Sequence, residues 1–134
     1  MGIRSDWSDD RQQLMIITIQ SPWTWEEFRS MANQAFVEIQ STDHPVATIM
    51  DVSQIGKLPS GNFLGHLQFV DSSMPKNVFA SVLVGAPYVV TSFMNILTRI
   101  RPTAKEIAFF ATSFDEAKAL VERRYQALYP EKRA

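Results

Sequence analysis

The fold is decided by one continuous stretch, Val46-Ala-Thr-Ile-Met-Asp-Val-Ser-Gln-Ile-Gly-Lys-Leu-Pro-Ser-Gly61. Residues 46–52 are almost uninterruptedly apolar, as a β-strand covered by side chains on both faces requires. The strand ends in Asp51 and Ser53, and a loop of small residues then leads to a helix predicted over residues 62–71. A strand followed by a loop and a helix is the repeating unit of α/β proteins, so we expect residues 46–52 to form a central strand.

The flanking segments extend this pattern in both directions. Capping boxes predict helices that begin after Thr24 and after Ser113, and a third helix follows Pro87. Apolar runs predict further strands at residues 3–7, 14–19, 78–85 and 106–111. The resulting order, β-β-α-β-α-β-α-β-α, predicts a single α/β domain over residues 1–134. Its sheet has four or five mostly parallel strands and an antiparallel hairpin at the N-terminus.

Length, charge and cysteine content argue against several classes of protein. The 134 residues fit one domain with one core. The formal net charge of −1, from 13 basic and 14 acidic residues, argues against binding to the phosphate backbone of a nucleic acid. The chain has no cysteine for disulfide or thiol chemistry, and a cytoplasmic setting fits best. No apolar run approaches the roughly 20 residues of a membrane span, so we expect a soluble protein.

Five short motifs follow one another along the chain: Asp51-Val-Ser53, Ser60-Gly61, Val82-Leu-Val-Gly85, Ile107-Ala-Phe-Phe110 and Thr112-Ser-Phe-Asp-Glu-Ala117. In this order they resemble the STAS family of bacterial anti-sigma-factor antagonists, and more closely an uncharacterised STAS-like branch. The resemblance covers nearly the whole chain and implies a regulatory α/β domain that binds other proteins. Antagonists of that family are switched by phosphorylation of a serine in an Asp-Ser-Ser-Gly motif. Here the motif reads Leu58-Pro59-Ser60-Gly61, with Pro59 at the usual phosphoacceptor position.

The first candidate site is the loop after the central strand, with Asp51, Ser53, Ser60, Gly61 and Asn62 as residues that would bind a ligand or a partner. Asp51 lies at the carboxyl end of a strand, where ligands bind open α/β sheets. Ser60 lies at a helix N-terminus, where added negative charge is stabilised. Each also has a structural interpretation, which we favour: Asp51 as a cap of its own loop, and Ser60 as the N-cap of the helix.

The second candidate site is an apolar surface formed by Phe69, Met74, Val90 and Met94. In the helix after Pro87, Val90 and Met94 form a second apolar column beside the predicted core stripe of Val89, Phe93, Ile96, Leu97 and Ile100. Such a wide stripe can indicate a partner surface, the wall of a pocket, or deep burial. Burial is the safer expectation for apolar side chains in general.

The remaining polar residues do not predict chemistry. His44 precedes Pro45 in a loop, and His66 lies off the apolar stripe of its helix, where we expect it to be solvated. Neither histidine has the spacing of a metal site. A serine hydrolase would need a Gly-x-Ser-x-Gly motif, which the chain lacks. The sequence therefore predicts no metal, no cofactor and no enzyme activity.

From these observations we predict a non-enzymatic regulatory or protein-interaction domain, with a protein partner and a homodimeric state. The alternative is a carrier or sensor of a small apolar or amphipathic ligand, held between the sheet and the helices. The carrier requires an apolar cavity, lined by Phe63, Leu67, Phe93 and Leu97. The protein binder requires a filled core and an exposed patch of Phe69, Val90 and Met94.

Overall fold

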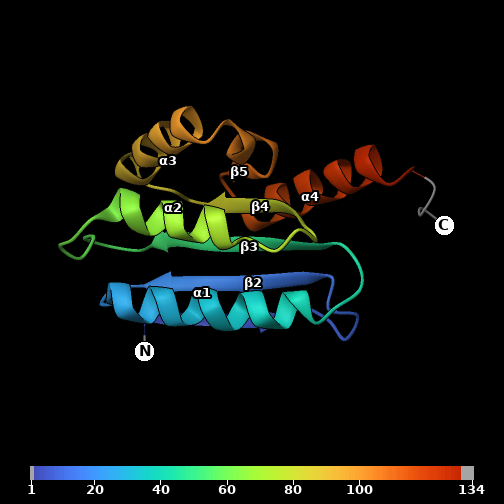
Figure 1. The fold of residues 1–134 in the computed structure, drawn as a ribbon, viewed down its shortest axis with the longest axis horizontal. Helices are drawn as coiled ribbons and strands as arrows, with labels where there is room; N and C mark the ends of the chain where they lie inside the picture. Colours follow the sequence, from blue (N-terminus) through green and yellow to red (C-terminus); the bar gives the residue numbers. More distant parts are fainter. Residues whose placement is uncertain (1, 131–134) are drawn as a thin grey trace.

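The strand predicted to be central is the middle strand of a five-stranded sheet (Figure 1). The structure is a computed structural model and describes residues 2–130. Strand β3, Val46–Gln54, lies between β2, Leu14–Gln20, and β4, Val78–Val84, and pairs with both in parallel. The prediction for residues 46–52 is therefore confirmed.

The two edge strands complete a mixed sheet in the order β1-β2-β3-β4-β5. Strand β1, Ile3–Trp7, forms the predicted antiparallel hairpin with β2, and β5, Ala108–Ala111, pairs in parallel with β4. The strand predicted over residues 106–111 starts too early, because Pro102–Glu106 forms a 3-10 helix, η1. The predicted α/β fold class and the order of its elements are confirmed.

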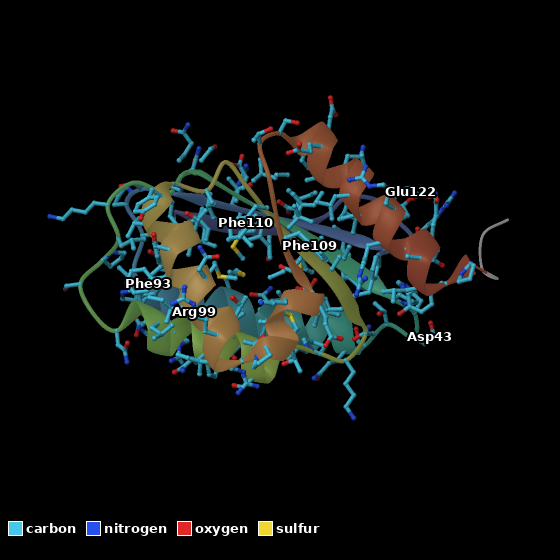
Figure 2. All side chains as sticks on the ribbon, turned by 90° about the horizontal axis from the view of Figure 1, so that it is seen from above. Asp43, Phe93, Arg99, Phe109, Phe110 and Glu122 are labelled. Carbon is cyan, nitrogen blue, oxygen red and sulfur yellow. The ribbon has the colours of Figure 1, made fainter. Side chains whose placement is uncertain are left out.

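Helices cover the two faces of the sheet unequally. Helices α1, Trp25–Gln40, α2, Phe63–Ser73, and α3, Tyr88–Ile100, pack on one face, where their apolar side chains form the main core with β2, β3 and β4. Helix α4, Phe114–Leu128, packs on the other face over β3, β4 and β5. Figure 2 shows α4 across the sheet from α2. Strand β3 is thus covered on both sides, as its continuous apolar sequence requires.

The start of α1 follows directly from its sequence. The hydroxyl of Thr24 accepts a hydrogen bond from the backbone N–H of Glu27 at 3.1 Å, and the Glu27 carboxylate accepts one from the N–H of Thr24 at 3.0 Å. Trp23, just before the cap, packs on Phe28 with ring centroids 6.1 Å apart. The predicted capping box and the predicted hydrophobic contact across it are both present.

Helix α3 presents a different face to the core from the one predicted. Its buried column is Val90, Met94 and Leu97, with Val90 and Met94 only 2% and 6% exposed. The interpretation of Val90 and Met94 as an exposed apolar interface is therefore wrong. Most of the predicted core stripe lies outside instead: Val89, Ile96 and Ile100 are 40%, 39% and 51% exposed. Both columns are apolar, so periodicity identifies two adjacent faces of the helix without choosing between them.

Substitution of Ile49 by alanine tests the double coverage of β3. The Ile49 side chain is fully buried, and its removal is expected to lower the free energy of unfolding by about 2–5 kcal/mol, through lost burial and a cavity. Val37→Ala, at a position on α1 that is 66% exposed, serves as the control and is expected to change it by at most about 0.5 kcal/mol. Urea unfolding measures both. A loss below about 1 kcal/mol for Ile49→Ala would contradict the burial of this strand.

Candidate functional site

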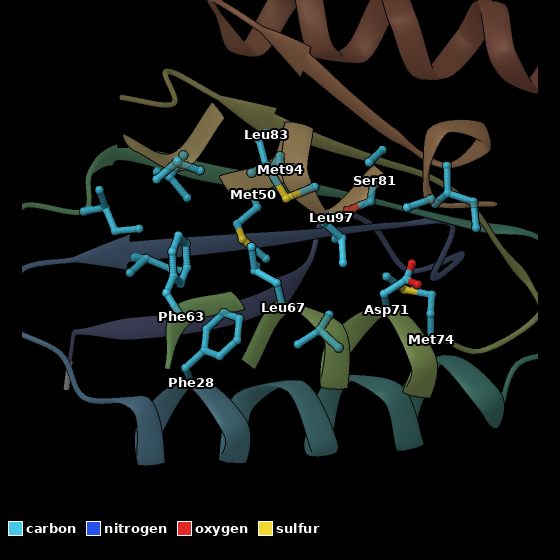
Figure 3. Close-up of a pocket in the computed structure, with 18 of the residues that line it drawn as sticks. Phe28, Met50, Phe63, Leu67, Asp71, Met74, Ser81, Leu83, Met94 and Leu97 are labelled. Carbon is cyan, nitrogen blue, oxygen red and sulfur yellow. The ribbon is translucent and has the colours of Figure 1, made fainter. Parts of the chain in front are cut away.

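An apolar cavity of about 90 Å³ lies between the sheet and helices α2 and α3 (Figure 3). Side chains from the sheet and from the helices on one of its faces surround it, and nearly all of them are aliphatic, aromatic or methionine. Asp71 and Ser81 are the polar residues that line it. The remaining lining residues are Ile19, Trp23, Phe28, Met50, Val52, Ile55, Phe63, Leu67, Val70, Met74, Leu83, Val90, Met94, Leu97, Ala104, Ile107 and Ala108.

The walls of the cavity follow from the periodicity of its strands and helices. In β3 and β4, Met50 pairs in register with Leu83, so both side chains project from the same face of the sheet toward the helices. In α2, Phe63, Leu67 and Val70 are spaced as one helical face and form the opposite wall. The buried column of α3 closes a third side. The cavity therefore lies where two helices meet one face of the two strands β3 and β4.

A smaller cavity of about 30 Å³ adjoins the first beneath α1. The two cavities share five lining residues: Phe28, Met50, Val70, Met74 and Ser81. Two of these are methionines, and a third methionine, Met94, lines the larger cavity. Because methionine side chains are unbranched and flexible, these walls can adjust to the shape of an enclosed molecule.

The polar residues of the larger cavity lie near one end of it. The Asp71 carboxylate accepts a hydrogen bond from Nε of Arg101 and forms an ion pair with it. The side chains of Asp71 and Arg101 are 14% and 41% exposed, so this end of the cavity lies close to the surface. On the sheet side, the Ser81 hydroxyl oxygen accepts a hydrogen bond of 2.8 Å from the Thr48 hydroxyl. Figure 3 shows Asp71 and Ser81 toward one end and Phe28 and Phe63 toward the other.

Helix α2 is held to α1 by a contact that sequence reasoning missed. The His66 ring stacks on Trp25 with centroids 4.3 Å apart, and its Nδ1 accepts a hydrogen bond of 2.9 Å from Nε of Arg29. The Arg29 guanidinium also lies 3.8 Å from the ring centroid of Phe69. His66 and Phe69 are therefore half-buried packing residues, and the expectation that His66 is solvated is wrong.

This contact matters because α2 has little core burial of its own. Within the helix, Phe63 is buried, while the other residues are half-buried or exposed. Met74, predicted to lie on an exposed interface, is half-buried and lines the cavity. Helix α2 is thus a lightly packed cover over the cavity, held to α1 through His66 and to Arg101 through Asp71.

The predicted loop site behaves as local structure. Oδ1 of Asp51 accepts hydrogen bonds from the backbone N–H and the hydroxyl of Ser53, at 3.0 and 2.7 Å. Asp51 therefore caps its own loop, which is the structural interpretation favoured above. The N-cap of α2 is Asn62, whose side chain accepts from the N–H of Gly65, so the prediction of Ser60 as N-cap is wrong. Ser60 and Gly61 are exposed.

The named loop residues also lie apart from the cavity, although Ile55 of the same loop lines it. None of the loop residues Asp51, Ser53, Ser60, Gly61 and Asn62 lines it. Trp25 instead links the loop to the core, because its Nε1 donates a hydrogen bond to the Pro59 carbonyl at 3.1 Å. The structure therefore places the predicted loop residues outside the cavity that Met74, Val90 and Met94 line.

Sequence reasoning overlooked the two polar residues of the cavity, Asp71 and Ser81, and also Arg101, which pairs with Asp71. A weak signal for Asp71 was present, since it is an acid that follows Phe69 and Val70 in an apolar helix. Ser81 gives a similar signal, because it places a hydroxyl group inside an otherwise apolar strand that is fully buried. Nothing in the sequence indicates that Arg101 pairs with Asp71, because the two are brought together only by the packing of α2 against α3.

Comparison with known proteins does not add to this description. No protein-family model and no curated protein matches the chain. Among residues 2–130, no group of three or more His, Asp or Glu side chains could hold a metal ion. Within the same part of the chain, no helix combines the length and the apolar character needed to cross a membrane.

The environment of His66 predicts how stability depends on pH. Burial, and then the charge of Arg29, lower the pKa of His66 below its ordinary value of 6.5. The unfolded chain therefore binds this proton more readily than the folded chain, so the free energy of unfolding is expected to fall as the pH drops from 7.5 through 6.5. His66→Phe retains an aromatic ring on Trp25 and removes the proton, so this part of the pH dependence should disappear. Urea unfolding at pH 7.5 and at pH about 5 tests this. An equal loss of stability in both proteins would show that His66 does not contribute.

Proposed function

We propose that this chain is a non-enzymatic carrier or sensor that binds one small apolar or amphipathic molecule in the cavity beneath α2 and α3. The observation that carries this proposal is the cavity itself, whose lining is apolar except for Asp71 and Ser81. Of the residues named above as the requirement for a carrier, Phe63, Leu67 and Leu97 line the cavity. Phe93 packs against Phe63, with centroids 4.7 Å apart.

The size of the cavity limits the ligand. One water molecule needs about 10–15 Å³ by this kind of measure, and an engineered apolar cavity of about 150 Å³ in another protein remains dry and binds benzene. A cavity of about 90 Å³ with methionine walls therefore suits one ring or a short aliphatic chain, and it is too small for a whole lipid. The resemblance to the STAS-like branch supports a sensor that passes the bound state on to another protein.

Toluene is a suitable probe of this proposal. A molecule that binds only the folded chain stabilises it, so near-saturating toluene is expected to raise the midpoint of thermal unfolding. Leu83→Phe and Leu97→Phe place extra atoms in the cavity and are expected to abolish this shift. Val37→Phe adds the same ring at an exposed position of α1 and should leave the shift unchanged. Absence of a shift for the unmodified chain would overturn the proposal.

A second candidate function, self-association, is favoured by the outer face of α3. Val89, Ile96 and Ile100 recur at helical spacing and are exposed, as is Tyr88 before them. This stripe replaces Val90 and Met94 as the surface through which a homodimer would form. Self-association and ligand binding are compatible, because the stripe and the cavity lie on different faces of the same helix.

Ile96→Glu tests self-association. A charge placed in an apolar interface loses its water without gaining a partner, so sedimentation is expected to show a dimer for the unmodified chain and a monomer for this variant. Asn95→Glu places the same charge at an exposed position one residue away on α3 and should leave the dimer intact. A chain that remains monomeric at high concentration would refute the proposed surface.

A further inference from the structure

We infer that the cavity is built for a small uncharged molecule with a hydroxyl group, which donates a hydrogen bond to Asp71 and accepts one from Ser81, while its apolar body points toward Phe63. This inference rests on the proposed function and specifies the class of ligand. Its basis is the polar groups at one end of the cavity: among the described residues, Oδ1 of Asp71 accepts no hydrogen bond, and the hydroxyl pair of Thr48 and Ser81 holds one hydrogen more than the bond between them uses.

The unpaired acceptor belongs to Asp71. Arg101 donates to Oδ2 of this carboxylate, and no hydrogen bond within residues 2–130 reaches Oδ1. A carboxylate accepts hydrogen bonds and cannot donate them, so Oδ1 can accept one from a donor in the cavity. Because Arg101 already balances the charge of Asp71, the ligand has no need to be a cation.

The available donor belongs to the hydroxyl pair of Thr48 and Ser81. One hydrogen bond of 2.8 Å joins the two hydroxyls, so whichever of them donates it, one hydrogen of the pair remains free to donate. Within residues 2–130 no second hydrogen bond takes up that hydrogen, and Ser81 is buried and lines the apolar cavity. Leaving a buried donor unpaired is unfavourable, and a ligand oxygen would satisfy it.

A single hydroxyl group meets both requirements, because its O–H can donate to Asp71 while its oxygen accepts from Ser81. A carbonyl or an ionised carboxylate accepts without donating, and an ammonium group donates without accepting. Ser81 lies on the sheet and Asp71 on α2, on facing walls of the cavity, and Figure 3 shows both near the same end. A hydroxyl at this end can therefore lie between the two side chains.

The rest of the cavity orients the apolar part of the ligand. Phe63 begins α2 and Asp71 lies eight positions later, which separates them by about 12 Å along the helix axis. Between them, the lining side chains of α2 are Leu67 and Val70. A ring or a short chain attached to the hydroxyl would extend along this wall toward Phe63 and Phe28. The ligand class is thus a phenol or a short-chain alcohol.

Phenol and toluene provide a matched pair of probes, because they have nearly the same shape and differ in a hydroxyl against a methyl group. A cavity without polar partners rejects phenol, since burying an unpaired hydroxyl is costly. We therefore expect calorimetric titration to give phenol a dissociation constant equal to or lower than that of toluene. If toluene binds and phenol has a dissociation constant at least tenfold higher, this inference is overturned while the proposed function stands. Binding of neither probe would overturn both.

Variants and a charged probe assign the effect to the named side chains. Ser81→Ala is expected to weaken phenol at least fivefold and to change toluene by less than twofold. Ser72→Ala removes an exposed serine of α2 outside the cavity and should change neither. Benzoate should bind more weakly than phenol, because a carboxylate has no hydrogen to donate to Asp71 and loses its hydration in an apolar cavity. Equal losses of phenol and toluene in Ser81→Ala, or tighter binding of benzoate, would overturn the assignment. The comparison of phenol with toluene in the unmodified chain does not depend on any variant folding.

Discussion

The packing of side chains against both faces of β3 is the constraint on which the rest of the structure depends. Ile49 projects toward α4, while Met50 and Val52 belong to the opposite face, where α1, α2 and α3 lie. The crossover helices α1, α2 and α3 all lie on one face, which keeps the parallel strands in sequential order, and α4, which follows the last strand, covers the other face. The cavity is a consequence of the same constraint, because three helices share one face and their side chains do not fill the space between them completely.

The fold could be predicted because its signals are local. The capping box at Thr24 and the apolar run in residues 46–52 each depend on neighbouring residues, and both are present as predicted. Errors occurred where local signals allow two answers. In α3, two adjacent apolar columns left its rotation undetermined, so Val90 was assigned to the surface although it is buried. Before α2, Ser60 and Asn62 are both good N-caps, and only the path of the loop selects Asn62.

The candidate site was far less predictable than the fold, because it depends on contacts between distant residues. Asp71 and Arg101 are separated by 30 positions, and Thr48 and Ser81 by 33. Each of these residues alone resembles an ordinary surface or strand residue. The loop around Asp51 attracted attention for the opposite reason, since its polar residues are adjacent in sequence. Their adjacency serves the loop itself, through the hydrogen bonds from Ser53 to Asp51.

The light packing of α2 sets the timescale on which anything can enter or leave the cavity. Local opening occurs first where few apolar side chains are buried, and in α2 only Phe63 is buried. If a molecule enters only after this helix moves, its association is slower than an encounter limited by diffusion. Residence time is then governed by how often α2 separates from Trp25 and Arg101, and two ligands of equal affinity would exchange at the pace of the same helix.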